Sequence, residues 1–110
     1  MKQRDICLAD LNPVKGSEQS GVRPVVVISG NAMNDNLNTC IVCPTSSNIK
    51  HYAGCIVLKK DDINQLDHDS EVITFQVRTI SKSRLVKKIG IVTESQLQQV
   101  LNGLMEVLTY

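Results

Sequence analysis

Residues 24–28, with the sequence Pro-Val-Val-Val-Ile, constrain the fold of this chain more than any other segment. The β-branched side chains from Val25 to Ile28 favour a β-strand, because branching at Cβ suits a pleated sheet better than a helix. No polar residue interrupts them, which is typical of a strand buried on both faces. Pro24 has no backbone N–H to donate and therefore suits the first position of the strand, which we predict to extend to Ser29. The chain must therefore build a β-sheet around this strand.

Apolar runs bounded by turn-forming residues predict the other strands. They lie at residues 6–9, 39–45, 54–58, 71–80 and 85–92, the last interrupted by Gly90. The side chains of 71–80 alternate between apolar and polar, so Gln76 and Arg78 are expected on the same face of a single strand. Residues 32–38 are rich in Asn and Asp, and we predict a loop there with room for one helical turn.

After these strands the hydrophobic period changes from two to about 3.6 residues. Thr93 followed by Gln96 has the pattern of a capping box, and we predict an amphipathic helix from Glu94 to Leu108. Its apolar stripe consists of Leu97, Val100, Leu101, Leu104 and Leu108. Gly103 is expected to cost about 1 kcal/mol of helix stability relative to alanine. Short strands followed by one helix predict a mainly β (α+β) fold: a small antiparallel barrel that forms one domain over residues 1–110.

The formal net charge is +1, so any nucleic-acid site must be a local patch. One basic cluster exists, and it consists of Lys82, Arg84, Lys87 and Lys88. An acidic cluster precedes it and is expected to face solvent; it consists of Asp61, Asp62, Asp67, Asp69 and Glu71. Residues 1–10 contain no apolar signal region, and no apolar run approaches the roughly 20 residues of a membrane helix. We expect a soluble cytoplasmic protein with no membrane association.

The spacing of Cys40 and Cys43 matches half of a zinc knuckle, but a second half is missing. Residues three apart in a strand point to opposite faces and cannot share one metal ion. We therefore expect all four cysteines, including Cys7 and Cys55, to be small buried hydrophobic residues. The sequence predicts no metal site and no cofactor.

A polar loop bracketed by Gly16 and Gly21 delivers Arg23 to the mouth of the strand at 24–29. The planar, permanently charged guanidinium is the side chain best matched to a phosphate. A structural ion pair with Asp10 or Glu18 is the alternative role for this arginine.

Thr45 follows Pro44 at the end of a predicted strand. Its hydroxyl can reach the same cleft as Arg23, or it can satisfy the turn that follows. The residues alone leave both readings open.

Three parts of the chain, taken in order, closely resemble the MazF/PemK family of toxin ribonucleases. They are residues 10–19 leading to 21–28, residues 44–46, and residues 76–80 with 83–85. The first is specific, because a Lys-Gly-Ser-Glu-Gln loop shortly before Arg-Pro and a β-branched run rarely arises by chance. The resemblance covers nearly the whole chain. Family members usually have glycine at the position of Arg4 and an acidic residue at that of Phe75, so this chain departs from the pattern there.

The resemblance implies an SH3-like barrel with a C-terminal helix, assembled as a homodimer that cleaves single-stranded RNA at short specific sequences. It also implies a cognate antitoxin, a small DNA-binding protein with a disordered acidic tail, and contact with operator DNA only through the toxin–antitoxin complex. Arg23 and Thr45 carry over as the catalytic pair. Residues implied to contact RNA are Lys15, Ser17, Gln19, Ser46, Gln76 and Arg78.

Metal-independent cleavage by the ribose 2′-OH requires a ligand for the charged phosphorane and two proton transfers. Arg23 can stabilise the charge, but it stays protonated and is a poor base. Glu18 is the only carboxylate of the loop and is the candidate base. His51 and His68 are expected to be surface residues outside the site. The alternative function is a non-catalytic barrel that binds a protein target such as gyrase, or that holds single-stranded RNA without cutting it.

Overall fold

The computed structural model describes residues 1–13, 16–18 and 21–110, so the predictions for Lys15 and Gln19 lie outside the described residues. The elements in chain order are β1 (Asp5–Asp10), β2 (Val22–Val27), α1 (Asn31–Asn36), β3 (Thr39–Ser46), β4 (Ile56–Leu58), β5 (Ser70–Val72), the 3₁₀ turn η1 (Thr74–Gln76), β6 (Arg78–Ser81), the 3₁₀ turn η2 (Lys82–Arg84), β7 (Leu85–Ile91) and α2 (Glu94–Thr109). The short helix α1 occupies the loop in which one helical turn was predicted. In the part of the chain described, no helix is long and apolar enough to cross a membrane.

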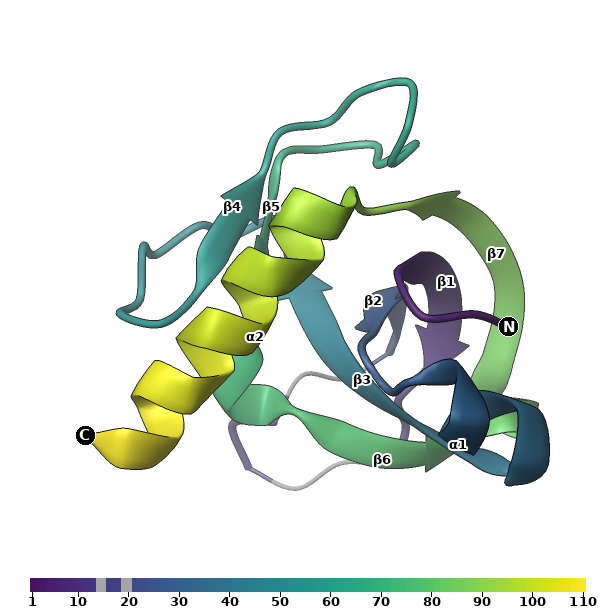
Figure 1. Ribbon diagram of the computed structural model, residues 1–110. Helices are drawn as coiled ribbons and strands as arrows, with labels where there is room; N and C mark the ends of the chain where they lie inside the picture. The colour runs from purple at the N-terminus through teal and green to yellow at the C-terminus, as the bar shows by residue number, and fades with distance from the viewer. Residues whose placement is uncertain (14–15, 19–20) are drawn as a thin grey trace.

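The strands form one antiparallel sheet around β3. Along the sheet the order is β4-β5-β3-β2-β1-β7, and β6 pairs with β3 as well. The sheet curls on itself, and α2 lies diagonally across it (Figure 1). Because β4 and β7 end the order without pairing among the described residues, the barrel is open. The predicted fold class, mainly antiparallel β with a C-terminal helix, is confirmed.

Both faces of β2 are buried from Val25 to Val27, as the unbroken β-branched run predicts. Val26 belongs to a core with Ile6 and Cys43 that also includes Leu97 and Val100 of α2. Val25 and Val27 point the other way, into a second core formed with residues of β1, β3 and β6. The central strands are thus packed on both sides.

The single strand predicted at 71–80 is wrong, because η1 divides it into β5 and β6. Both strands pair with the same edge of β3, β6 along residues 39–42 and β5 along 45–46. Between them the backbone turns, and the Ile73 N–H donates to the Pro44 carbonyl oxygen at 2.9 Å. Alternation cannot reveal such a turn, since the apolar residues on either side of it, Ile73 and Val77, still pack in the core. The break predicted at Gly90 is also wrong, because β7 runs through it. A Cβ at Gly90 would overlap the backbone of Asn64, so this glycine serves close packing.

The helix α2 begins as predicted. The Thr93 hydroxyl accepts from the Gln96 N–H, and the Gln96 side chain accepts from the Thr93 N–H, which completes the capping box. Gly103 is buried, and its backbone packs closely against Gly54. A Cβ at this position would overlap the carbonyl oxygen of Gly54. Leu108 was predicted in the apolar stripe but is 70% exposed, since the end of α2 extends beyond the sheet (Figure 1).

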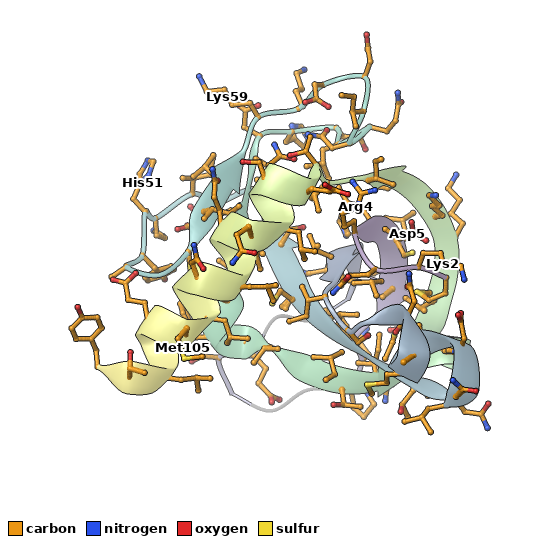
Figure 2. The ribbon with its side chains drawn as sticks, viewed as in Figure 1. Lys2, Arg4, Asp5, His51, Lys59 and Met105 are labelled. Atoms are coloured by element: carbon orange, nitrogen blue, oxygen red, sulfur yellow. The ribbon has the colours of Figure 1, made fainter. Side chains whose placement is uncertain are left out.

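The solvent-facing reading of the acidic cluster is wrong for Glu71, which is fully buried. Its Oε1 accepts from the backbone N–H groups of Lys50 and His51 at 2.8 and 3.2 Å, and Oε2 accepts from that of Tyr52 at 2.8 Å. Figure 2 shows the His51 side chain pointing outward from this segment. A buried carboxylate therefore holds the connection between β3 and β4 in place.

Arg4, at a position where the resemblance implies glycine, adopts a φ of +80°. This left-handed conformation is one that glycine reaches without a steric cost. The Arg4 side chain donates from Nη1 to the Val92 carbonyl oxygen at 3.3 Å. The departure from the family pattern thus falls at a position where the backbone itself favours glycine.

Candidate active site

A cavity of about 640 Å³ opens where β2 begins and β3 ends. Its apolar part comes from the β1, β2 and β7 strands and from Leu66. Its polar and charged lining consists of Arg23, Thr45, Ser47, Gln65, Asp67, His68, Ser70, Lys87 and Lys88. The cavity therefore combines several cations with hydrogen-bonding groups beside the predicted catalytic pair.

A hydrogen bond links Arg23 directly to Thr45. The Nη1 of Arg23 donates to the backbone carbonyl oxygen of Thr45 at 3.0 Å, and Thr45 Oγ1 donates to the carbonyl oxygen of Pro24 at 2.7 Å. The antiparallel register that pairs Val25 with Pro44 brings these groups together. Arg23 is half-buried, whereas Thr45 is only 2% exposed. The hydroxyl therefore ties two strands together rather than satisfying the turn that follows it.

The basic cluster at 82–88 divides into two parts. Lys87 and Lys88 line the cavity, and Lys88 Nζ lies 3.2 Å from Oδ1 of the buried Asp5. Lys82 instead donates to the Asn34 carbonyl oxygen. Of the four residues of this basic cluster, only Lys87 and Lys88 add their charge to that of Arg23 in the cavity lining.

Arg84 anchors the chain that follows β1. Its Nη1 donates to the Asp10 carbonyl oxygen at 3.2 Å and also to that of Asn12. This guanidinium therefore holds residues 10–12, at the end of β1, against η2.

A second, smaller depression of about 180 Å³ brings together three of the other predicted residues, Glu18, Gln76 and Arg78. Its lining consists of Glu18, Pro44, Phe75, Gln76, Val77 and Arg78. Gln76 Nε2 donates to the Ser17 carbonyl oxygen at 3.2 Å, and Arg78 Nη1 lies 3.5 Å from the Leu11 carbonyl oxygen. These contacts connect η1 and β6 to the loop that carries Glu18.

Alternation along β3 separates the two depressions, since Pro44 lines the smaller one and Thr45 lines the cavity. The predicted site thus consists of two groups, Arg23 with Thr45 and Glu18 with Gln76 and Arg78. Ser46, also half-buried, accepts from the Asn48 N–H at 3.1 Å.

The aromatic ring of Phe75 lines the smaller depression, and the ring of Tyr52 packs against it. Phe75 packs edge-to-face on Tyr52, with ring centroids 5.1 Å apart, and the two are 44% and 45% exposed. The position where the family usually has a carboxylate therefore presents an aromatic ring in this chain.

Sequence reasoning assigned no site role to seven polar or charged residues of the cavity lining: Ser47, Gln65, Asp67, His68, Ser70, Lys87 and Lys88. His68 is exposed, as predicted, but it also lines the cavity. It lies in the connection between β4 and β5, far along the chain from Arg23. No local pattern around His68 indicates that this connection reaches the mouth of β2.

The cysteines behave mostly as predicted. Cys40 and Cys43 point into different cores, so their strand positions do put them on opposite faces. Burial raises the pKa of the Cys43 thiol to about 12 and that of Cys7 to about 11, and it also raises the pKa of Cys40. Cys55 is half-exposed, so the prediction of burial is wrong for this residue. Protonated, buried thiols are poor nucleophiles.

The fold and the site define a small open β-barrel with one helix across it and a cation-lined cleft at the start of a central strand. The chain belongs to the family of PemK-like, MazF-like toxins of type II toxin–antitoxin systems, whose model matches residues 2–108. A curated relative, Endoribonuclease MazF of Staphylococcus saprophyticus, is 36% identical over 105 residues, which are 94% of this chain and 88% of the relative.

Solved structures agree on the fold. MazF from Deinococcus radiodurans superposes with a TM-score of 0.86 at 23% identity, covering 100% of this chain and 97% of that one. An endoribonuclease in complex with its cognate antitoxin, from a mycobacterial species, gives a TM-score of 0.80 at 16% identity and covers 98% and 94% of the two chains.

Proposed function

We propose that this protein is a sequence-specific endoribonuclease that cleaves single-stranded RNA without a metal ion, acting as the toxin of its toxin–antitoxin pair. The observation that carries the proposal is the bonded pair of Arg23 and Thr45 at the cation-lined cavity. The name of the staphylococcal relative supports the same activity.

In the proposed reaction the ribose 2′-oxygen attacks the adjacent phosphorus and the bond to the 5′-oxygen breaks. The products are a 2′,3′-cyclic phosphate, or a 3′-phosphate after its hydrolysis, and a 5′-hydroxyl. Arg23 stabilises the charge that builds on the phosphorane, where a fixed donor contributes most. Thr45 holds the guanidinium through its carbonyl oxygen. For its hydroxyl to bind a phosphate oxygen as well, that hydroxyl must leave Pro24.

The smaller depression is the proposed place of RNA recognition. Gln76 can both donate to and accept from a base edge, and Arg78 carries charge for the backbone. Ser17 and Ser46 are proposed to extend this surface. Glu18, the candidate base from the sequence, lines this depression and not the cavity with Arg23 and Thr45.

Two partners complete the proposal. We propose that the protein acts in the cytoplasm. We also propose that it forms a homodimer, because the apolar side chains of Met105 and Leu108 on α2 are exposed. A cognate antitoxin with a disordered acidic tail would cover the cation-lined cavity and compete with RNA there. Operator DNA would be bound only by the toxin–antitoxin complex.

The test is incubation of the purified protein with a long single-stranded RNA in EDTA. We expect discrete fragments with 5′-hydroxyl ends, and no cleavage of DNA or of RNA with 2′-deoxyribose at the cut site. The control is Arg23→Lys, purified identically, which keeps the charge but loses the bidentate fork and should cleave at least about 100-fold more slowly. Fragments with 5′-phosphates, or activity lost in chelator, would contradict the mechanism. Binding without any cleavage would favour the non-catalytic alternative.

A further inference from the structure

The cleavage proposed above needs a group that accepts the 2′-OH proton, and neither Arg23 nor its described hydrogen-bond partner Thr45 supplies it. Arg23 itself is a donor only. The Thr45 hydroxyl already donates to Pro24, and its side chain is buried. Glu18 lines the smaller depression, which opens on the other side of β3 from Thr45.

The cavity that holds Arg23 and Thr45 contains two side chains able to accept a proton, Asp67 and His68. The ammonium groups of Lys87 and Lys88 can only donate. An imidazole is a much stronger base than a carboxylate, and yet it is largely neutral at physiological pH. His68 is therefore the better acceptor of the two.

Strand pairing explains why His68 reaches this cavity. Thr45 pairs with Val72 and Ser46 with Glu71, so β5 runs directly beside the end of β3. His68 lies two residues before β5, and its carbonyl oxygen accepts from Ser70 Oγ at 2.9 Å. The backbone is thus held at the cavity edge, while the exposed imidazole stays accessible to RNA.

We propose that His68 is a further catalytic residue, the general base of the cleavage; this rests on the proposed ribonuclease function. A neutral ring nitrogen takes the proton of the 2′-OH as the 2′-oxygen bonds to phosphorus. The bond from phosphorus to the 5′-oxygen breaks, and the leaving oxygen takes a proton from water in the open cavity. The imidazolium then returns its proton to solvent, so atoms and charge balance over one turnover.

Several charged groups surround His68. Asp67 and Asp69 lie on the same connection, and Asp69 accepts from the Lys60 N–H at 2.9 Å. Across the cavity lie Arg23 of β2 and the two lysines of β7.

The experiment compares His68→Asn with His51→Asn in single-turnover cleavage of one RNA oligonucleotide across a pH series. His51 is the matched control, because it is the other histidine of the chain, is exposed, and is absent from the cavity lining. Its φ of +56° is one that asparagine tolerates. We expect His68→Asn to lower the cleavage rate constant about 10²- to 10⁴-fold, with RNA affinity within about threefold of the wild type. The decline of rate at acidic pH should disappear in this variant and persist in the control.

The inference is overturned if His68→Asn cleaves within about threefold of the wild type, because a general base contributes far more. It is also overturned if Asp67→Asn or Glu18→Gln, and not His68→Asn, abolishes the acidic decline. Equal urea midpoints for wild type and His68→Asn are expected, since the side chain is exposed; a rate loss explained by unfolding would count against the inference. Failure of the wild type to cleave RNA would instead overturn the proposed function itself.

Discussion

The guanidinium of Arg23 donates to the carbonyl oxygen of Thr45 at 3.0 Å, so the backbone of one residue orients the side chain of the other. Thr45 in turn is fixed by its hydroxyl bond to Pro24, which adjoins Arg23 in β2. The two bonds close a small circuit between β2 and β3. An arginine held in this way needs little reorganisation to meet a phosphate, and preorganisation of this kind is a large part of electrostatic catalysis.

Substitution of the Thr45 side chain can separate the role of its hydroxyl from that of its backbone carbonyl. Thr45→Val keeps the carbonyl and the shape but leaves the Pro24 carbonyl oxygen without its donor, which should cost about 1–2 kcal/mol of folding stability. We expect its cleavage rate to fall about 100-fold, as for loss of one transition-state donor, while Thr45→Ser stays within about tenfold. Urea unfolding and single-turnover cleavage measure the two effects. Wild-type cleavage by Thr45→Val would leave only the carbonyl with a role.

Replacement of Gly103 by alanine should destabilise the protein although alanine is the better helix former. A Cβ at this position would overlap the carbonyl oxygen of Gly54, which is backbone and cannot rotate away. We expect an overpacking cost of about 1–3 kcal/mol that exceeds the gain of about 1 kcal/mol in helix propensity. Urea unfolding tests this against Asn102→Ala, an exposed neighbour in α2 that should change stability by less than about 0.5 kcal/mol. An increase in stability for Gly103→Ala would mean that α2 does not pack this closely.

Glu71→Gln should unfold more easily because an amide cannot accept at both ends. Its NH₂ group would face one of the three backbone N–H groups now bound by the carboxylate, and an unsatisfied buried donor costs about 1–3 kcal/mol. The matched control is Asp69→Asn, an exposed carboxylate of the same acidic cluster. Proteolysis should cut the variant preferentially at residues 48–54. Equal stability of Glu71→Gln and wild type would contradict the role given to this carboxylate.

Buried thiols predict a loss of stability at alkaline pH. Burial raises the folded-state pKa of Cys43 to about 12 and of Cys7 to about 11, above the ordinary value of 9.0. The unfolded chain therefore loses these protons first, so the stabilisation is complete below about pH 9 and declines as the pH rises towards 11–12. Urea unfolding from pH 8 to 10.5 should show this decline. We expect Cys43→Ala to be less stable than the wild type at pH 8. The difference in the free energy of unfolding between the two should narrow as the pH rises. A difference that does not change with pH would argue against thiol ionisation as the cause.

Features that depend on neighbours in sequence could be predicted. The cap at Thr93 and the start of α2 are set by residues three apart, and an unbroken β-branched run is enough to bury both faces of β2. The Arg23–Pro24 step is equally local, although β2 begins at Val22, two residues before the predicted start at Pro24. The opposite orientations of Cys40 and Cys43 follow directly from the period of a strand.

Only the tertiary structure decided which distant residues meet. Burial of Glu71 depends on three backbone N–H groups of the connection between β3 and β4, about twenty residues earlier in the chain. The division of 71–80 depends on pairing with two stretches of β3. The exposure of Leu108 follows from the sheet ending before α2 does. Gly103 must be glycine because Gly54, far away in the chain, packs against it. His68 likewise lines the cavity beside residues that are distant in the chain. Periodicity reports which face of an element is apolar, but contact across elements depends on where the chain turns back, and no local pattern encodes that.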